Sequence, residues 1–315
     1  DITISKKESW NKFLVNIDYR TDASRTHKFL NSLNNKYTRE NPEPKIINNK
    51  EISDNTVIAN KFNSFYANQY SLSKQNKMKN KIFKKLNKTQ QREHEPNEEI
   101  FNKEFTKLEL EEAIRDLKSG KQPGPDGIFP EFIKNLGSNA KTVLLNILNT
   151  YWKSEENLPT DWLKAIIIPI HKKGKPKQQL SSYRPIALTS VIVKVQEKLL
   201  LTRLKWYLEK NSILAPEQAG FRENRSTSQQ ILRITQEIKE TFNKRESLLA
   251  TFVDFKGAYD TIWREKLVNK LISAGIRGNT LKWLKRFLNQ RWISTKYNNI
   301  KSKYRQTKTG YHREL

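Results

Sequence analysis

The stretch LLATFVDFKGAYD, residues 248–260, decides how this sequence is interpreted. Residues 248–253 form an apolar run of strand length, which is typical of a strand buried on both faces of its sheet. Asp254 follows at once, so its carboxylate is expected at the edge of that sheet, facing solvent or a cation. Gly257 then allows a tight turn before the next helix. The alternative is that Asp254 is an ordinary strand-end residue that caps this turn.

Rigid carboxylates at strand ends have a specific chemical use. Two-metal phosphoryl transfer needs them, because they hold two Mg²⁺ ions roughly 3.5–4 Å apart. Tyr259 lies five residues after Asp254, where an aromatic ring could form the wall of a nucleotide pocket. The segment therefore indicates phosphate chemistry as a candidate function.

Two short extended segments upstream enclose a cluster of lysines. Residues 165–170 (AIIIPI) have strand length, and Pro169 indicates an edge strand or a bulge, while residues 186–188 form the second segment. Between them lies a lysine-rich turn at 172–177, and Arg184 precedes a proline that holds its backbone extended. Such a mobile cationic hairpin suits a triphosphate, because a guanidinium binds phosphate oxygens bidentately. The alternative is a basic surface turn.

The rest of the pattern is largely helical. Thr106 and Glu109 form a capping box, Ser190 is expected to cap another helix, and the Pro- and Gly-rich segment 121–128 (KQPGPDGI) forces a rigid loop. The basic stretch 71–92 has no acidic residue and indicates a solvated linker or, alternatively, a phosphate-contacting arm. Apolar residues at helical spacing predict helices at 55–70, 105–118, 138–153, 190–210, 228–243, 264–274 and 280–290.

The composition indicates a polyanionic partner. The chain has 315 residues and a formal net charge of +26, which favours nucleic acid or an anionic membrane surface. No apolar run approaches the roughly 18–20 residues that span a bilayer, so nucleic acid is the favoured partner. The absence of cysteine excludes a disulfide scaffold and thiolate zinc sites. The same absence fits an intracellular protein. The sequence begins with Asp1, shows no signal peptide and ends abruptly at Leu315, so we expect a fragment at both ends.

Four segments occur in an order that one enzyme family shares. They are KQPGPDGI followed by PEFIK (121–134), the block from LPTDWLKAIIIPIHKKGKP to SSYRPIALTS (158–190), QAGFRENRST (218–227) and FVDFKGAYD (252–260). The last segment resembles motif A, the first catalytic motif of reverse transcriptases. The others resemble the fingers blocks of enzymes from non-LTR (LINE-type) retrotransposons, in particular the jockey-like elements of arthropods. The resemblance covers roughly residues 100–310.

The resemblance implies an α+β protein with the right-hand polymerase fold. Residues 1–100 would be a mostly helical, basic linker region, residues 101–245 the fingers, and residues 246–315 a partial palm. The implied activity is RNA-directed DNA polymerisation, in which a DNA primer is extended along a template RNA by attack of its 3′-OH on a dNTP. The implied cofactor is Mg²⁺, with Mn²⁺ as a substitute. The implied location is the nucleus, with no membrane partner.

The resemblance assigns the catalytic roles to one short segment. Asp254 would be the catalytic carboxylate, and it would bind metal together with the backbone carbonyl of Phe255. Tyr259 matches the position that screens the sugar 2′ position, where a bulky ring would exclude a ribose hydroxyl. The alternative for Tyr259 is core packing.

The resemblance also assigns binding roles to cations. Lys173 or Lys175 would grip the triphosphate together with Arg184, neutralising the phosphate charge that develops during the reaction. The residues expected to contact nucleic acid are Arg222, Arg225, Lys282, Lys285, Arg286 and Arg291. Arg222 and Arg225 could instead cap surface helices, and Trp283, Trp292 and Tyr297 are expected to be packing or stacking residues.

One part of the family pattern is missing from the sequence. The second metal motif of the family is a pair of adjacent aspartates, and no Asp-Asp pair occurs in these 315 residues. The glutamine–glycine turn expected after Thr309–Gly310 is also absent. Because one carboxylate cannot organise two metal ions, we expect a C-terminally truncated domain that gives no product in a primer-extension assay. Two alternatives remain, a catalytically dead nucleic-acid-binding remnant and an intron maturase-like protein.

Overall fold

In the computed structural model the described residues are 2–15, 45–47, 50–70, 99–255 and 257–310. The chain divides into two compact units, Asp1–Ser53 and Asp54–Leu315. The basic stretch 71–92 lies outside the described residues, so its role stays a prediction. The first unit contains helix α1 (Ile2–Val15) and an antiparallel hairpin of β1 (Lys45–Ile47) and β2 (Lys50–Ile52).

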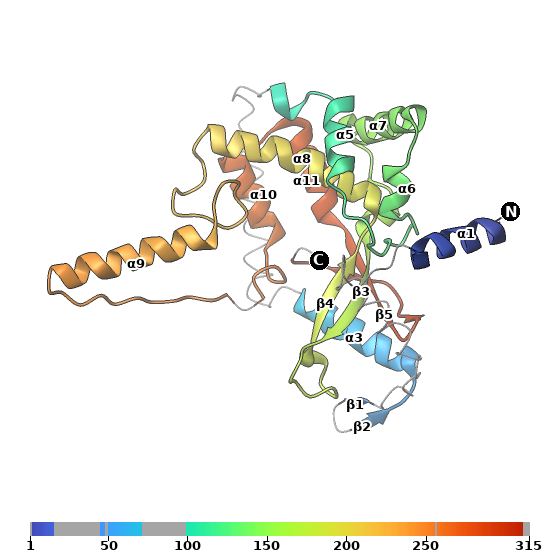
Figure 1. Ribbon diagram of the computed structural model, residues 1–315, viewed down its shortest axis with the longest axis horizontal. Coiled ribbons are helices and arrows are strands. Elements are labelled where there is room, and N and C mark those ends of the chain that lie inside the picture. Colours follow the sequence, from blue (N-terminus) through green and yellow to red (C-terminus); the bar gives the residue numbers. More distant parts are fainter. Residues whose placement is uncertain (1, 16–44, 48–49, 71–98, 256, 311–315) are drawn as a thin grey trace. The chain divides into compact units, whose positions relative to one another are not determined.

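The second unit combines helices with one mixed sheet (Figure 1), which confirms the α+β class. Among the described residues, no helix has the length and apolar character needed to cross a bilayer. The α-helices are α3 (Asn55–Gln69), α5 (Lys107–Arg115), α6 (Pro130–Lys134), α7 (Ser138–Lys153), α8 (Val191–Lys210), α9 (Thr227–Asn243), α10 (Arg264–Ser273) and α11 (Gly278–Asn289). Short 3₁₀ turns are η1 (Glu99–Phe101), η2 (Thr160–Leu163) and η3 (Leu180–Ser182).

The sheet has five strands in the order β4–β3–β5–β6, and β7 also pairs with β5. β4 runs antiparallel to β3 and β5 runs parallel to it, so β3 lies between them. The strands expected at 165–170 and 186–188 are confirmed, whereas β5 was not expected from the sequence. The strands are β3 (Lys164–His171), β4 (Tyr183–Leu188), β5 (Arg291–Tyr297), β6 (Ile300–Lys301) and β7 (Arg305–Thr307).

Pro169 lies at the point where β3 has lost one of its two neighbours. β5 pairs with β3 only from Lys164 to Ile167, and Pro169 faces Pro185 of β4. The Lys172 amide bonds to the Ser182 carbonyl, so Pro169 and Pro185 form a non-hydrogen-bonded pair in this register, and the N–H that Pro169 lacks would face the side where β5 no longer pairs. The proline therefore occupies an edge position on an otherwise internal strand, as its presence in the apolar run predicted.

A helical core supports the start of β3. Trp152 of α7 and Trp283 of α11 are fully buried in one apolar cluster, to which α5 and α8 also contribute. Trp283 stacks on Phe287 with 4.7 Å between ring centroids. Trp162 and Leu163, which lead directly into β3, are buried in the same cluster. Burial of each large apolar side chain contributes roughly 1.5–3 kcal/mol, so this cluster fixes where the sheet begins.

Two of the expected helix caps have different outcomes. The capping box is confirmed, because the Glu109 amide donates to Thr106 Oγ1 and the Thr106 amide donates to Glu109 Oε2. Ser190 does precede α8, but its side chain makes no capping bond. A Cβ at Gly124 of the 121–128 loop would lie 2.4–2.5 Å from backbone atoms of Thr189 and Ser190. This loop therefore packs directly on the beginning of α8.

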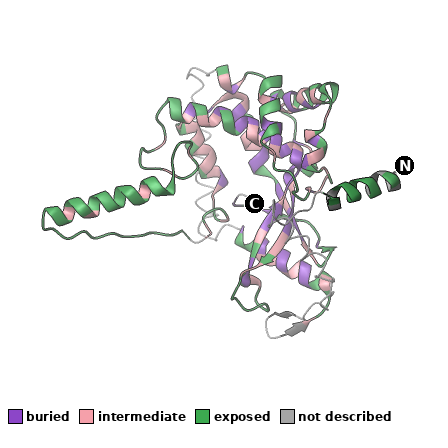
Figure 2. Cartoon of the chain, viewed as in Figure 1, coloured by how far each residue is buried: buried purple, intermediate pink, exposed green. Residues whose placement is uncertain are grey.

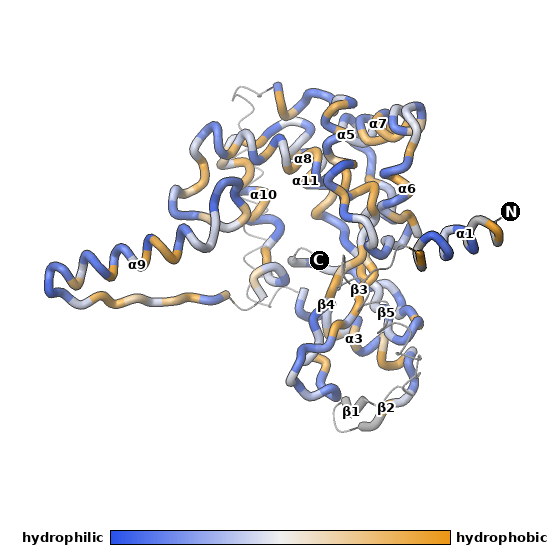
Figure 3. Tube along the Cα trace, viewed as in Figure 1, coloured by the Kyte–Doolittle hydropathy of each residue, from blue (hydrophilic) through white to orange (hydrophobic). Residues whose placement is uncertain are grey.

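The buried strand expected at 248–253 is a correction. Residues 246–255 have no assigned strand or helix, and Leu249, Phe252 and Val253 are 92%, 83% and 73% exposed. The preceding helix α9 has no buried residue, and Figure 2 shows both segments almost entirely as exposed. Figure 3 shows that the stretch after α9 is largely hydrophobic. An apolar run becomes a sheet strand only when another strand satisfies its backbone, and no described strand pairs with this one.

Candidate nucleotide and nucleic-acid interface

The β3–β4 hairpin ends in a turn that is held by its own side chains. Lys172 donates through its amide to the Ser182 carbonyl (2.8 Å) and through Nζ to the Ser181 carbonyl (2.7 Å). His171 Nε2 lies 2.8 Å from the Lys175 carbonyl, and the Tyr183 hydroxyl donates to the Lys177 carbonyl at 2.9 Å. These bonds give the lysine-rich turn a defined conformation, although Lys172 is occupied by them.

Three of the predicted triphosphate-binding cations lie at this end of the hairpin. Lys173 and Lys175 are exposed on the turn, and Arg184 is exposed on β4, where it pairs with Ile170. The sequence has no acidic residue between Asp161 and Glu197, so no carboxylate from the hairpin itself neutralises them. The structure thus brings these three cations to one solvent-facing end, as a ligand with several phosphates would require.

The predicted metal-binding residues lie in the exposed segment after α9. Asp254 is exposed, and Phe255 is 76% exposed. In the described part of the chain, no three acidic or histidine side chains gather around a common point as metal ligands would. An exposed carboxylate next to a backbone carbonyl offers the hard oxygen donors that Mg²⁺ prefers. The meeting of Asp254 with the hairpin cations stays a prediction.

The turn after Asp254 is well defined at its far end. Gly257 has a φ of +63°, as the tight turn at this position predicted, and its carbonyl accepts hydrogen bonds from the amides of Asp260 and Thr261, both at 3.0 Å. Tyr259 is 37% exposed and meets Phe221 edge-on, with 6.5 Å between ring centroids. This contact is compatible with both expectations for Tyr259, a pocket wall and a packing residue.

The two arginines of the third block differ in their surroundings. Arg222 forms a two-pronged ion pair with Glu209, at 2.8 and 2.6 Å, and also donates to the Ala215 carbonyl. Arg225 is exposed before α9. Arg222 therefore has a structural role, because it joins its loop to the end of α8. Arg225 is accessible to a ligand.

The cations predicted to contact nucleic acid after Glu265 are mostly engaged in the fold. Arg286 donates to the carbonyls of Tyr151 (2.7 Å) and Glu156 (2.6 Å), and Lys282 pairs with Glu155 at 2.5 Å. Arg291 is only 3% exposed and lies over the Phe287 ring. Trp283 and Tyr297 are packing residues that stack on Phe287 and Phe62, and Trp292 is partly buried on β5. Among the four predicted contacts in this region, Lys285 has no hydrogen bond or ion pair with the described residues.

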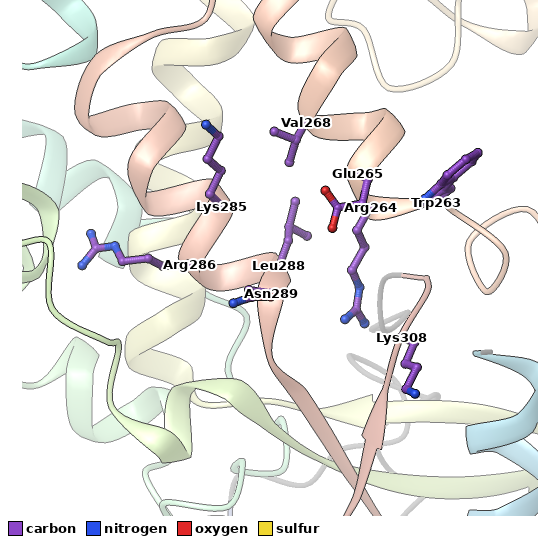
Figure 4. Close-up of a pocket in the computed structure, with 9 residues that line it drawn as sticks. All are labelled: Trp263, Arg264, Glu265, Val268, Lys285, Arg286, Leu288, Asn289 and Lys308. Carbon is purple, nitrogen blue, oxygen red and sulfur yellow. The ribbon is translucent and has the colours of Figure 1, made fainter. Parts of the chain in front are cut away.

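Lys285 lines a cavity of about 310 Å³ between α10 and α11. Figure 4 shows Glu265 and Val268 of α10 opposite Leu288 of α11, and Arg264 reaching toward the segment after β7 that carries Lys308. Arg264 is buried and donates to the carbonyls of Thr307, Thr309 and Gly310 at 3.0–3.1 Å. Burial, and then the nearby charge of Arg291, lower the pKa of Arg264 to about 10. Its hydrogen bonds make Arg264 a structural residue of this cavity.

Comparison with known proteins identifies this part of the chain. Residues 170–312 match the family described as reverse transcriptase (RNA-dependent DNA polymerase). They are a reverse transcriptase domain of the non-LTR retrotransposon type. The matched residues include the β3–β4 hairpin turn, Arg184 and the whole of FVDFKGAYD. The resemblance to non-LTR reverse transcriptases is therefore confirmed, while the segment 121–134 and the start of the 158–190 block lie outside the matched residues.

The relatives of this reverse transcriptase domain include fruit-fly mobile elements. The chain is 36% identical over 163 residues to the probable RNA-directed DNA polymerase from transposon BS of Drosophila melanogaster, which covers 52% of this chain. It is 32% identical over 167 residues to the corresponding X-element protein of the same species, and 31% identical over 162 residues to its mobile element jockey polymerase, covering 53% and 51% of this chain. The matches span 18% of each relative.

Proposed function

We propose that this domain acts in an RNA-directed DNA polymerase, where the β3–β4 hairpin grips the triphosphate of an incoming dNTP. The observation that carries the proposal is the gathering of Lys173, Lys175 and Arg184 at one solvent-facing end of that hairpin. In this reaction the primer 3′-hydroxyl attacks the α-phosphorus, the bond to the β-phosphate breaks, and pyrophosphate leaves. The protein fold would be a right-hand polymerase, with residues 101–245 as fingers and residues 246–315 as part of the palm.

The hairpin cations would act on the leaving group. Negative charge builds up on the β- and γ-phosphates as the α–β bond breaks, and fixed cations stabilise that charge in the transition state. Arg184 offers a planar fork for two phosphate oxygens, whereas Lys173 and Lys175 act as point charges. The paired backbone of β3 and β4 keeps these groups near one another. The hairpin would thus hold the nucleotide and assist departure of pyrophosphate.

Asp254 would supply the metal side of the site. Its carboxylate and the adjacent Phe255 carbonyl are the oxygen donors that would hold Mg²⁺, or Mn²⁺ in its place. Bound there, the cation would supply Lewis-acid stabilisation of the reacting phosphate. Tyr259, five residues later, would lie against the sugar and disfavour a ribose 2′-hydroxyl. Template RNA and DNA primer would follow the cationic surface to which Arg225 and Lys285 contribute.

The proposal can be tested with a fluorescent dNTP analogue titrated against residues 1–315 in the presence of Mg²⁺. Arg184→Gln should weaken binding by about tenfold, because a hydrogen bond to a charged group contributes roughly 1.5–3 kcal/mol. Combined replacement of Lys173 and Lys175 by Gln should weaken it by a similar factor. Lys239→Gln is the matched control, since it removes one exposed positive charge from α9 and should change nothing. Unchanged affinity in all three hairpin substitutions would overturn the proposal.

The exposed position of Asp254 favours one second candidate, a nucleic-acid-binding remnant without enzymatic activity. Such a protein would bind single strands with a salt slope of about −0.7 per neutralised phosphate, and Mg²⁺ with dNTP would leave its properties unchanged. A thermal shift with dNTP that depends on Mg²⁺ and is lost in Asp254→Ala would favour the polymerase. The comparisons, all with mobile elements, do not favour the intron maturase-like alternative.

A further inference from the structure

Helix α3 lies outside the residues that match the reverse transcriptase family, yet it is built into the sheet of the domain. Phe62 and Tyr66 are fully buried, and the Phe62 ring stacks on Tyr297 of β5 with 5.7 Å between centroids. Asn63 is also fully buried, and its Nδ2 donates to the Lys303 carbonyl at 2.6 Å. These contacts join α3 to the two segments on either side of β6. The helix is therefore held in a defined position against the sheet.

Tyr70, the C-cap residue of α3, binds the segment after β7 through its backbone. Its side chain is only 1% exposed. Its carbonyl accepts hydrogen bonds from the amides of Lys308 and Thr309, both at 3.0 Å. The end of α3 is thereby attached to the chain that follows β7.

The hydroxyl of Tyr70 reaches a third segment, the one that follows Asp254. It forms a side-chain hydrogen bond with Asp260, the last residue of FVDFKGAYD. Burial, and then the charge of Asp260 and this hydrogen bond, raise the pKa of Tyr70, so the phenol keeps its proton at neutral pH. The Asp260 carbonyl accepts a further bond from Thr309 Oγ1 at 3.2 Å. Asp260 is thus held through both its side chain and its backbone.

Gly310 shows how closely the three segments approach. It has a φ of +73°, and a Cβ at this position would lie 2.5 Å from the Asp260 carbonyl oxygen and 2.7 Å from the Tyr70 ring. Its amide donates to the Ile262 carbonyl at 2.8 Å. No residue other than glycine fits here without a shift of the backbone. The contact between α3 and the turn after Asp254 is therefore a close-packed part of the fold.

We propose that Tyr70 is a positioning residue for the Asp254 segment, acting by fastening Asp260 to the sheet through α3. The exposed stretch 248–255 has no strand partner among the described residues, so its downstream end at 257–264 is where the fold restrains it. Asp254 lies six residues before Asp260, and Tyr259 is the residue directly before Asp260. The hydrogen-bonded Asp260 is therefore the fixed point from which the chain leads back to the Tyr259 ring and to the carboxylate proposed to bind metal. This inference rests on the proposed function only for the role of Asp254, since the tether itself can be measured separately.

Tyr66 of α3 and Tyr70, its C-cap residue, allow a matched test on residues 1–315. Tyr70→Phe removes the hydroxyl that bonds Asp260. Tyr66→Phe, one turn earlier, removes an equally buried hydroxyl that has no hydrogen-bond partner among the described residues. Hydrogen exchange followed by mass spectrometry should show amides in 257–264 exchanging about tenfold faster in Tyr70→Phe, because one hydrogen bond to a charged group is lost. Tyr66→Phe should leave these amides unchanged.

A second measurement separates positioning from general stability. In Tyr70→Phe, dNTP binding with Mg²⁺ should weaken several-fold, while binding without Mg²⁺, which depends on the hairpin cations, should stay at the wild-type value. Asp260→Asn should give the same pattern, and the two substitutions combined should do no more than either alone. Equal exchange rates in Tyr70→Phe and Tyr66→Phe would overturn the tether. A wild-type chain without any Mg²⁺-dependent dNTP binding would instead contradict the proposed function, with the exchange result still deciding the tether.

Discussion

The two apolar runs AIIIPI (165–170) and LLATFV (248–253) have similar composition and opposite environments. The first forms the middle of β3, where Ile167 is fully buried between β4 and β5. The second has no assigned secondary structure, and Leu249 is 92% exposed. Hydrophobicity measures how much a segment gains from burial, whereas the presence of neighbouring strands decides whether the burial takes place. The comparison teaches that the two segments to which we assign nucleotide and metal binding differ in how far the fold supports them.

The largest expected effect is the difference in stability between matched truncations of the two runs. Ile167→Ala should lower the free energy of unfolding by about 2–5 kcal/mol, because it leaves a cavity in the sheet core. Leu249→Ala should change it by less than about 0.5 kcal/mol, as expected of an exposed side chain. Urea unfolding followed by circular dichroism measures both. Similar losses in the two variants would show that 248–253 is buried in solution and would remove the contrast.

The ion pair between Glu109 and Arg203 should make a contribution to stability that depends on pH and is of intermediate size. Burial alone would raise the pKa of Glu109, but hydrogen bonds from Arg203 and Thr106 and the charge of Arg203 lower it below its usual value. Because the folded pKa is depressed, the stabilisation is present above the pKa of the unfolded chain and is lost as the pH falls through the folded value. Glu109→Gln should therefore cost about 1.5–3 kcal/mol at pH 7 and progressively less in acid.

Glu223→Gln is the control for this pH dependence. Glu223 pairs with Lys205 at 3.2 Å, but its side chain is 79% exposed, so its removal should leave the unfolding profile unchanged at every pH. Thermal unfolding from pH 3 to 8 compares the two variants. A Glu109→Gln curve that parallels the wild type at all pH values would show that the Arg203 pair contributes nothing to the packed region.

The smallest effect concerns the loop that closes the packed region at the end of β4. Gly124→Ala places a methyl group against the backbone of Thr189 and Ser190, and overpacking of this kind costs about 1–3 kcal/mol. Gly220→Ala is the control, since a Cβ there would meet no atom within 4 Å. Differential scanning calorimetry should show a lower melting temperature for the first variant only. Equal melting temperatures would mean that the 121–128 loop does not pack on α8 in solution.

Local signals made much of this fold predictable. The Thr106–Glu109 capping box, the proline in β3 and the glycine turn after Asp254 each act within a few residues, and each is found where the sequence placed it. The cationic turn at 172–177 is likewise a local feature, and its position at the end of a hairpin followed from the two runs that flank it. The ordered motifs then identified the family.

The remaining features depend on contacts between residues far apart in the sequence. β5 contains Ser294 and Thr295, which are fully buried although polar, because Ser302 and Asn63 satisfy them from elsewhere in the chain. No apolar run marks such a strand. In the same way, the predicted exposure of Arg291 could not take account of Phe287, over which its guanidinium lies. Pairing partners of this kind are not encoded within any single segment.

The point at which β5 leaves β3 has a mechanical consequence. Beyond Ile167 the hairpin is a two-stranded ribbon, because β5 pairs with β3 only as far as that residue. A ribbon of two strands bends more easily than a sheet of three or more, so bending should concentrate where β5 ends while the sheet behind it stays rigid. The tip that carries Lys173 and Lys175 can then swing as a unit and follow a phosphate chain through successive positions without loosening the core.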